Sequence, residues 1–264
     1  MMNEKWSCLV EYFKTFESAA VAFSGGVDST FLLKAAKEAL GDQVVAVTVV
    51  LNSFPERERE EARAFCKKEQ ITQIECSMNE LEIEGFSANP KNRCYLCKKA
   101  LFTQMMKLTE ERGIEILVEG SNLDDEGDYR PGMAAISELG MRSPLREIGF
   151  TKAEIRAISE QLGLSTWRKP SFACLSSRFV YGETITREKL KMVEKAEEFL
   201  HDHGFIQIRV RMHGMMARIE AMPEDFLKLV QMHEMINKKL KELGFTYVSM
   251  DLEGYRTGSM NIFS

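Results

Sequence analysis

Two sets of residues in this sequence have types and spacings that could support chemistry, and the first is a glycine turn. It spans residues 24–29 (SGGVDS), between a short apolar run and a stretch with helical spacing of apolar residues. Glycines let a backbone approach an anion closely and direct its N–H groups at it, and the first turn of a helix adds partial positive charge. The turn therefore predicts a phosphate-binding loop.

The side chains of this turn suit a nucleotide. Ser24 and Ser29 offer hydroxyl donors, and Gly25 and Gly26 give the backbone its freedom. Asp28 does not suit an anion, so we expect it to hold a metal ion, Mg²⁺ in the case of bound ATP, or to cap the helix. The turn is not a Walker A loop, because that loop needs the pattern GxxxxGK[ST].

The second set is three cysteines. Cys94 and Cys97 form a CxxC at the start of an expected helix, where the helix N-terminus and the flanking basic residues favour thiolate. A CxxC alone is half a zinc site, a redox pair or part of an iron–sulfur cluster. Cys174 lies in a stretch rich in Pro, Ser and Arg, which is a poor setting for a core thiol. Three thiolates would suit a [4Fe–4S] cluster whose fourth iron stays open to an extra sulfide.

The elements that must position the turn are strands and helices in alternation. Short apolar runs predict four strands, at residues 19–23, 44–51, 70–77 and 115–118. Helical stretches between them indicate an α/β fold with a doubly wound parallel sheet, which binds ligands at the carboxyl ends of its strands. Gly120 follows the fourth run and lies at that edge. Thr48, late in the second run, either faces the adenine or ribose or is a plain strand threonine.

Residues 123–150 read as a loop-rich segment. Three acids there, Asp124, Asp125 and Asp128, either form a solvated turn or hold Mg²⁺. Thr151 and Glu154 have the spacing of a capping box, which predicts a helix from there to residue 162. The other three cysteines (Cys8, Cys66 and Cys76) read as small core residues.

We expect three parts in the chain: a nucleotide domain over residues 1–168, a linker with Cys174 over residues 169–185, and a small α+β domain for substrate or oligomerisation over residues 186–264. In the last part the pattern predicts helices at 187–203 and 223–243 and strands at 205–211, 217–222 and 245–250. Arg209 and Arg211 alternate on the first of these strands and so share a face. They form either a paired phosphate clamp or a solvated edge.

Composition limits the class of protein. The chain has 264 residues, a formal net charge of −5 and a pI near 5.6, which argues against a large electrostatic surface for nucleic acid. No apolar run approaches the length of a membrane span, and no secretory signal is visible. Six cysteines without such a signal indicate a reducing compartment. We therefore expect a cytoplasmic protein with no membrane or nucleic-acid partner.

Taken in order, these motifs resemble those of the LarE-type ATP-dependent sulfur transferases, a family of the PP-loop ATP pyrophosphatase superfamily. The matching stretches are SGGVDS at 24–29, NPKNRCYLCK at 89–98, GSNLDD at 120–125, DYRPG at 128–132, KPSFACLSSRFVYG at 169–182, RVR at 209–211 and DLEGYR at 251–256. The resemblance runs almost from end to end. The stretch around Cys174 and the Arg-x-Arg strand are its most specific parts, whereas many activities share SGGVDS.

The resemblance implies an enzyme of nickel-pincer cofactor biosynthesis. Such an enzyme adenylates a carboxylate of pyridinium-3,5-biscarboxylic acid mononucleotide with ATP, releases pyrophosphate, and then replaces AMP with sulfur. The implied cofactors are ATP and Mg²⁺, and the implied assembly is a homo-oligomer, often a hexamer. By the same resemblance Arg209 and Arg211 lie near the substrate phosphate, with Glu220 close by.

Members of this family differ in their source of sulfur. Some give up the sulfur of the cysteine that corresponds to Cys174, which becomes dehydroalanine, so each polypeptide is consumed. Others have cysteines that match Cys94, Cys97 and Cys174 and hold a [4Fe–4S] cluster that relays added sulfide. This sequence has all three, so we favour the cluster-bearing type, with Cys174 as a sacrificial donor the alternative.

Three other functions share parts of this pattern. A tRNA thiolase pairs a PP-loop with a three-cysteine cluster, but such enzymes commonly have Lys at the position of Val27 and carry RNA-binding additions. An ammonia-using ligase such as an NAD synthetase shares SGGxDS but does not need a CxxC. A regulatory module without catalysis would bind ATP without releasing pyrophosphate and would leave the three thiols unexplained.

Overall fold

The computed structural model describes residues 4–125, 131–170, 173–256 and 258–261. The chain forms two compact units, the first made of Met1–Asn79 and Cys94–Phe172 and the second of Glu80–Arg93 and Ala173–Ser264. Residues 80–93 thus leave the first unit and pack with the second.

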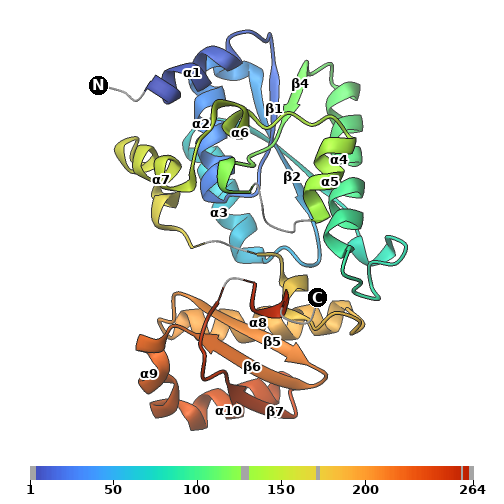
Figure 1. Ribbon diagram of the computed structural model, residues 1–264, viewed down its shortest axis with the longest axis vertical. Coiled ribbons are helices and arrows are strands. Elements are labelled where there is room, and N and C mark those ends of the chain that lie inside the picture. Colours follow the sequence, from blue (N-terminus) through green and yellow to red (C-terminus); the bar gives the residue numbers. More distant parts are fainter. Residues whose placement is uncertain (1–3, 126–130, 171–172, 257, 262–264) are drawn as a thin grey trace. The chain divides into compact units, whose positions relative to one another are not determined.

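The first unit is built on a parallel sheet of four strands in the order β3-β2-β1-β4 (Figure 1). The strands are β1 (Ala19–Ala22), β2 (Val44–Val50), β3 (Thr72–Ser77) and β4 (Ile116–Val118). The chain enters at the centre of the sheet and winds outward in both directions, since Ala19 pairs with both Val44 and Ile116. The predicted α/β class with a parallel sheet is confirmed.

Helices cover both faces of this sheet (Figure 1). They are α1 (Glu4–Phe13), α2 (Val27–Leu40), α3 (Glu56–Lys68), α4 (Arg93–Glu111) and α7 (Lys152–Gln161). One apolar cluster joins α1, α2, α3 and α7 to the sheet and includes Trp6, Phe31 and Ile155. A second cluster, with Phe102 and Met105 of α4, lies on the other face. Burial on both faces explains why β1 and β2 are apolar at every position except Thr48 of β2.

Residues 123–150 differ from the expected loop, because short helices occupy much of them. Helix α5 spans Pro131–Glu138 and α6 spans Pro144–Ile148, with Pro144 at the start and Gly149 in the left-handed region at the end. The capping box of α7 is confirmed, because the Thr151 hydroxyl accepts from the Glu154 amide and the Glu154 carboxylate accepts from the Thr151 amide. Asp128 lies outside the described residues.

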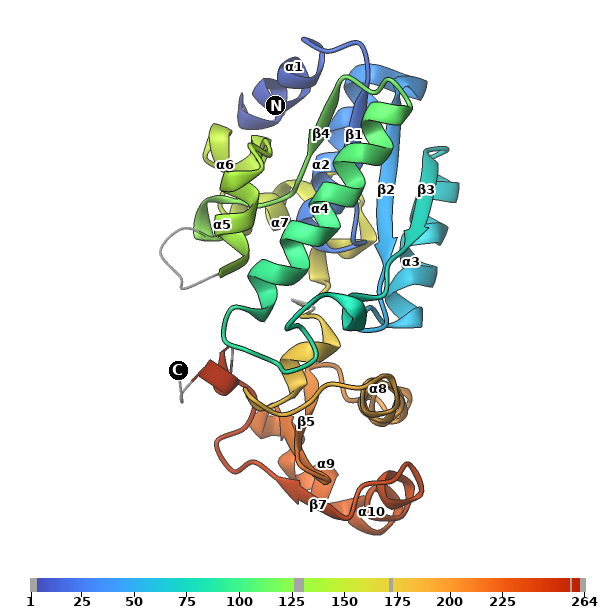
Figure 2. The same cartoon turned by 90° about the vertical axis from the view of Figure 1, so that its right-hand side faces the viewer.

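The second unit has a sheet of three strands in the order β5-β6-β7. Strand β5 (Ile208–His213) is antiparallel to β6 (Met216–Ala221), and β6 is parallel to β7 (Tyr247–Met250). Helix α8 (Arg187–Asp202) packs against β5 (Figure 2). The helix expected over residues 223–243 is broken: a 3₁₀ turn precedes α9 (Phe226–Gln231), and Met232 separates α9 from α10 (His233–Glu242).

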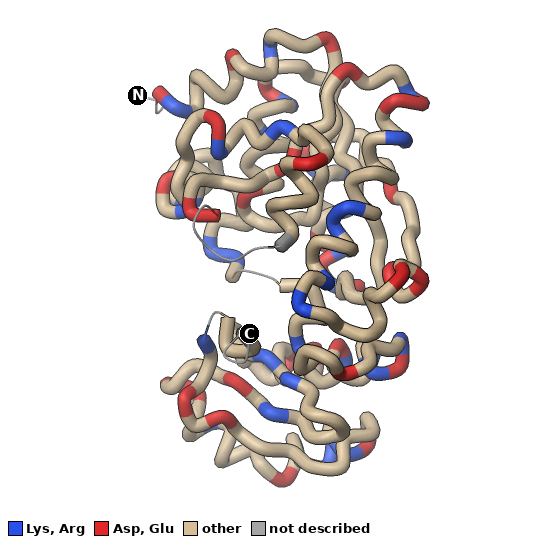
Figure 3. Tube along the Cα trace, turned by 45° about the vertical axis from the view of Figure 1, so that its right-hand side comes forward, with Lys and Arg blue, Asp and Glu red and all other residues tan. Residues whose placement is uncertain are grey.

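Charges of both signs are interspersed along both units (Figure 3). Within the described ranges, no helix combines the length and the apolar character that a membrane span requires.

Candidate functional site

The glycine turn lies where β1 ends and α2 begins. Gly25 has a φ of +70°, and a Cβ at this position would lie 3.1 Å from the Cβ of Ala62. Gly26 occupies the N-cap position of α2 and has no side chain with which to cap it. The first amides of the helix therefore face the region beyond the carboxyl end of β1, which is the arrangement that binds an anion.

The two serines have different positions in the turn. Ser29 is 6% exposed, and its hydroxyl donates to the Gly26 carbonyl at 3.3 Å and accepts from the Ser24 amide at 3.3 Å. Ser24 is exposed, and its Oγ lies 3.2 Å from the Oγ of Ser29. Ser29 thus shapes the turn, while Ser24 presents its hydroxyl at the surface of the unit.

Asp28 is paired with a cation that the sequence alone did not single out. Lys152, the first residue of α7, donates its Nζ to Asp28 Oδ2, and Asn122 Nδ2 donates to Asp28 Oδ1 at 3.3 Å. The side chains of Lys152 and Asp28 are 30% and 22% exposed. An ammonium group and a carboxylate thus lie together at the turn, within reach of solvent.

Gly120 and Thr48 also lie beside the turn. A Cβ on Gly120 would lie 3.2 Å from the Ser29 amide nitrogen, so glycine lets the segment after β4 approach the first turn of α2. Thr48 is 1% exposed; it donates to the Phe23 carbonyl at 2.8 Å and accepts from Gln73 Nε2 at 3.0 Å. These contacts fix the end of β1, and a contact of Thr48 with a nucleotide stays a prediction.

The acids after Asn122 bind backbone amides. Asp125 Oδ2 accepts from the Asn122 amide at 3.0 Å, and Asp124 Oδ2 accepts from the Lys152 amide at 2.7 Å. Asp124 therefore provides an acceptor for a backbone amide at the start of α7, the helix that carries Lys152.

A second lysine contacts the glycine turn. Lys169 donates to the Gly25 carbonyl at 3.1 Å and pairs with Glu58 at 2.6 Å and Glu61 at 2.7 Å. Its side chain is only 12% exposed. Burial raises the pKa of Glu61, but the hydrogen bond from Lys169, together with Arg57, outweighs burial and holds that pKa below its ordinary value. Lys169 therefore fixes the turn to α3.

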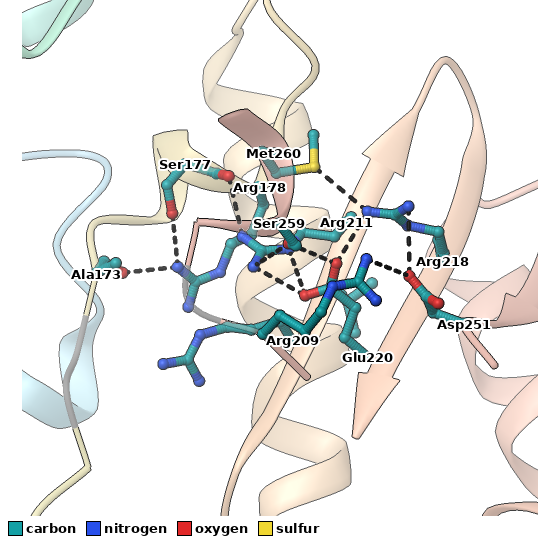
Figure 4. A network of polar contacts seen from close by, with 12 residues as sticks. Ala173, Ser177, Arg178, Arg209, Arg211, Arg218, Glu220, Asp251, Ser259 and Met260 are labelled. Carbon is teal, nitrogen blue, oxygen red and sulfur yellow. Dashed lines mark hydrogen bonds and ion pairs between the residues drawn. The ribbon is translucent and has the colours of Figure 1, made fainter. Parts of the chain in front are cut away.

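In the second unit, the two alternating arginines of β5 have different partners (Figure 4). Arg211 is 5% exposed and donates to Glu220 at 2.9 Å, to the Ser177 carbonyl at 3.1 Å and to Ser259 Oγ at 3.0 Å. Arg209 is 4% exposed, donates to the Ile208 carbonyl at 2.7 Å and lies over the Tyr255 ring at 5.3 Å. Although β5 lies at the edge of its sheet, both arginine side chains are buried, which excludes the alternative that they are solvated.

Other buried charged side chains surround these arginines. Burial lowers the pKa of Arg209, and the neighbouring Arg178 lowers it further. Glu220 is fully buried and also accepts from Arg218 Nη2 at 2.9 Å and from Ser259 Oγ at 2.7 Å. Buried cations at this density would favour an anion beside Arg209.

Cys174 is exposed and precedes the 3₁₀ turn Leu175–Arg178. Arg178, which is fully buried, donates to the carbonyls of Ala173 at 2.8 Å and Cys174 at 3.4 Å. Its Nε and Nη2 bind both carboxylate oxygens of Glu197 at 2.8 and 2.9 Å. The backbone that carries the Cys174 thiol is thus held by a guanidinium that is itself anchored on α8.

Cys94 and Cys97 lie in the first turn of α4, with Cys94 exposed and Cys97 partly buried. They belong to the first unit, and Cys174 belongs to the second. In the described part of the chain, no three His, Cys, Asp or Glu side chains gather into a metal site. The cluster stays a prediction.

The other cysteines follow expectation in part. Cys66 is buried, and burial, with a smaller contribution from Glu75, raises the pKa of its thiol to about 12. Cys76 is partly buried. Cys8, expected in the core, is exposed, because the buried face of α1 is formed by Trp6, Leu9, Val10 and Phe13.

A parallel sheet with a glycine turn between its first strand and the following helix defines a class of nucleotide-binding domain. Residues 2–128 match the PP-loop domain family. The chain is also 28% identical over 204 residues to the glutamine-hydrolysing GMP synthase of Aeropyrum pernix, a match that covers 70% of this chain and 39% of that protein. The first unit is therefore a PP-loop domain.

Two relatives match nearly the whole chain. An uncharacterised protein of Synechocystis is 42% identical over 264 residues, covering 99% of this chain and 98% of that protein. The pyridinium-3,5-bisthiocarboxylic acid mononucleotide synthase of Lactiplantibacillus plantarum is 37% identical over 262 residues, covering 97% of this chain and 94% of that protein. The chain therefore belongs to the family of this synthase, the LarE-type family, as its motifs predict.

Proposed function

We propose that this protein is an ATP-dependent sulfurtransferase that converts a carboxylate of pyridinium-3,5-biscarboxylic acid mononucleotide into a thiocarboxylate for the nickel-pincer cofactor. The observation that carries the proposal is the helix start at Gly26, which presents backbone amides directly after β1, in a chain that aligns over 97% of its length with the synthase. We assign ATP to the first unit and the phosphate of the mononucleotide to the second.

The first step is adenylation of the substrate. A carboxylate oxygen attacks the α-phosphorus of ATP, the bond from that phosphorus to the bridging oxygen breaks, and pyrophosphate leaves with the electron pair. The amides of the turn and the Ser24 hydroxyl would stabilise the leaving group. Asp28 fits a Mg²⁺ ligand because it is a partly exposed carboxylate at this edge. Asp28 would hold the ion, which would supply positive charge beside the phosphates, and Lys152 Nζ, which contacts Asp28, would be available for the pyrophosphate.

The second step replaces AMP with sulfur. A sulfur nucleophile attacks the acyl carbon, the carbon–oxygen bond to AMP breaks, and AMP leaves with the electron pair. Cys94, Cys97 and Cys174 fit a [4Fe–4S] cluster as a donor set, because two of the thiols are exposed and the third is only partly buried. When bound, such a cluster would supply an open iron that holds the added sulfide.

In the alternative route Cys174 supplies the sulfur itself. Its thiolate attacks the acyl-adenylate to form a thioester and expel AMP. A base then takes the α-proton of residue 174, the Cβ–S bond breaks, and the sulfur leaves with the product while dehydroalanine stays in the chain. The exposed thiol on a turn anchored by Arg178 suits this route as well.

We propose that Arg209 and Arg211 lie near the substrate phosphate, because both guanidinium groups belong to β5 and are 4% and 5% exposed. Arg211 also holds Glu220, which accepts from it at 2.9 Å. We also propose that the protein is a homo-oligomer, which light scattering after size-exclusion chromatography tests.

The test of this function combines a reaction with an analysis of metal. Protein purified without oxygen should release pyrophosphate and AMP only when both ATP and the dicarboxylate mononucleotide are present. Ser24→Ala should lower this release. The control is Ser165→Ala, at an exposed serine that begins the 3₁₀ turn Ser165–Arg168, and it should not lower the release. Iron and acid-labile sulfide that are present in the parent and lost in Cys94→Ala would support the cluster. Protein without iron that emerges about 34 Da lighter, the mass of H₂S lost from a cysteine, supports the sacrificial route. Pyrophosphate release without the mononucleotide would contradict the substrate assignment.

A further inference from the structure

Lys169 is a buried cation that the proposed chemistry does not use. Its side chain is 12% exposed, and its ammonium group lies 2.6 Å from the carboxylate of Glu58 and 2.7 Å from that of Glu61, both on α3. Its third acceptor is the Gly25 carbonyl, at 3.1 Å. Two carboxylates already balance the charge of Lys169, so its bond to a neutral carbonyl in the glycine turn serves another purpose.

The backbone of Lys169 is also held in place. Arg156 of α7 donates its Nη2 to the Lys169 carbonyl at 2.8 Å and its Nη1 to the Trp167 carbonyl. Trp167 belongs to the 3₁₀ turn Ser165–Arg168, which packs against α7 and α2. Lys169 therefore reaches the glycine turn from a fixed point of the same unit.

The carbonyl that Lys169 binds belongs to the peptide between Gly25 and Gly26. The carbonyl and the N–H of a trans peptide point in opposite directions, so Lys169 turns the Gly26 N–H away from itself. The Gly26 amide donates to the Ser24 hydroxyl at 3.4 Å, and Ser24 is exposed. The Gly26 amide and the Ser24 hydroxyl thus lie on the side of the turn opposite Lys169.

Glycine on both sides of this peptide allows it to rotate. Gly25 has a φ of +70° and neither residue carries a Cβ, so sterics alone do not fix the direction of the peptide. A rotated peptide would direct a carbonyl oxygen, in place of an N–H, at the anion that the turn binds. An N–H attracts a phosphate oxygen and a carbonyl oxygen repels it.

We propose that Lys169 is a positioning residue that keeps the amide of the Gly25–Gly26 peptide directed at the pyrophosphate part of ATP. The inference rests on the proposed binding of ATP at this turn, and it is independent of the mononucleotide and of the source of sulfur. Without the ammonium group, the loss should fall on ligands whose phosphates occupy the turn. Pyrophosphate is such a ligand, whereas AMP lacks that part of ATP.

The test compares the affinities for pyrophosphate and for AMP, each with Mg²⁺, by calorimetry. Lys169→Met removes the ammonium group and keeps an unbranched side chain. It should weaken the binding of pyrophosphate and of ATP about tenfold or more, while the affinity for AMP stays within about twofold. A merely structural role would weaken the binding of all three ligands alike. Lys169→Arg keeps a donor for the Gly25 carbonyl and should retain most of the affinity for pyrophosphate.

Two further variants serve as controls. Lys34→Met removes a lysine of α2 that pairs with Glu69 at 2.7 Å, and it should leave the affinities for pyrophosphate and AMP unchanged. Lys169→Met combined with Glu58→Gln has the net charge of the parent, so it separates the direction of the peptide from the loss of a charge. This double variant should bind pyrophosphate as weakly as Lys169→Met does.

Hydrogen exchange of α2 and α3 verifies that each variant keeps its fold. The double variant leaves no carboxylate at position 58 without its cation, so it decides the matter where Lys169→Met does not fold. Parental affinity for pyrophosphate in Lys169→Met or in the double variant would overturn the proposal, as would an equal loss of pyrophosphate and AMP.

The release of pyrophosphate separates this inference from the proposed function. A parent that binds pyrophosphate in a manner dependent on Lys169, but releases none from ATP and the mononucleotide, supports the positioning role and removes the proposed substrate. A parent that releases pyrophosphate, with an affinity for it that does not depend on Lys169, supports the proposed function and overturns the positioning role.

Discussion

Glu197→Gln should weaken the second unit far more than a change at its surface. The Glu197 side chain is 5% exposed and accepts two hydrogen bonds from Arg178, at 2.8 and 2.9 Å. Its Oε1 also accepts from the Val210 amide at 2.9 Å, which ties α8 to β5. Glutamine keeps the shape but removes the charge, so the fully buried guanidinium of Arg178 loses this counterion.

The magnitude follows from burial. Removing one partner of a buried ion pair costs about 3–5 kcal/mol, and we expect the lower end, about 3 kcal/mol, because the amide oxygen of glutamine still accepts one hydrogen bond. The matched control is Glu198→Gln on the same helix. It removes a pair with Lys195 whose side chains are 46% and 49% exposed, and such a pair contributes about 0.2–1 kcal/mol.

The pH dependence of stability gives a second expectation. Burial raises the pKa of Glu197, but Arg178 outweighs burial and holds that pKa below its usual value. An acid whose pKa is lowered by folding stabilises the protein above its unfolded pKa of about 4.3, and this stabilisation is lost as the pH falls through the folded pKa. Below about pH 4.3 the parent should therefore lose more stability per pH unit than Glu197→Gln.

Hydrogen exchange is the appropriate assay. Both tryptophans, Trp6 and Trp167, belong to the first unit, so tryptophan fluorescence reports that unit alone. Amides of α8 and β5 should exchange about a hundredfold faster in Glu197→Gln than in the parent, since about 1.4 kcal/mol corresponds to tenfold. Exchange in Glu197→Gln that matches Glu198→Gln would refute the reasoning.

Three other predictions concern the first unit. Gly25→Ala should weaken ATP binding, measured by calorimetry, at least tenfold, whereas the control Gly41→Ala should leave it unchanged. Both glycines have a positive φ, so each variant should lose about 1–2 kcal/mol of stability. Only Gly25 has a close neighbour and lies in the turn. Lys152→Gln should lower kcat/KM for pyrophosphate release by about 10–100-fold, because a cation beside the leaving group is lost. Lys5 and the Thr151 amide lower the pKa of Glu154 to about 2. The stability that Glu154 adds should therefore decline as the pH falls from 4.5 towards 2. Glu154→Gln should remove this pH dependence, which acid unfolding measures.

Each of these has a contrary result. Equal ATP affinity in Gly25→Ala and Gly41→Ala would mean that the turn does not hold the nucleotide. An unchanged kcat/KM in Lys152→Gln would leave the lysine as a partner of Asp28 alone. Identical acid unfolding in the parent and Glu154→Gln would show that the contact with Lys5 adds nothing to stability.

Local patterns predicted most of the fold. The apolar runs of β1 and β2 and the capping box of α7 are signals contained in a few neighbouring residues, and the structure has the expected elements there. The sequence pattern did not predict helices that are short, or a helix end that no glycine or proline marks. Helices α5 and α6 lie between glycines and prolines that read as loop, and no glycine or proline marks the break at Met232.

The site was predictable only in its local part. The turn at residues 24–29 is a local motif, but the two lysines that contact it are distant in the sequence. Lys152 is 124 residues from Asp28, and Lys169 is 144 residues from Gly25. Such pairs are set by the topology of the chain, which the spacing of residues does not encode. For Thr48 the sequence left two alternatives, a nucleotide contact or a plain strand threonine, because its partners Phe23 and Gln73 are each 25 residues away in the sequence.

The buried charged residues of the second unit indicate that this unit has a function beyond stability. Arg178, Glu197, Arg209, Arg211 and Glu220 are each 0–5% exposed in a unit of modest size. Apolar residues of similar volume often stabilise a protein as well as a buried ion pair does or better, so stability alone does not account for such a set. The PP-loop domain match ends at residue 128, before all five of them. Under the function that we propose, the shared domain would serve the chemistry of ATP. The buried charges would serve what the second unit adds, which is the binding of an anionic substrate and a cysteine on a turn that a guanidinium holds.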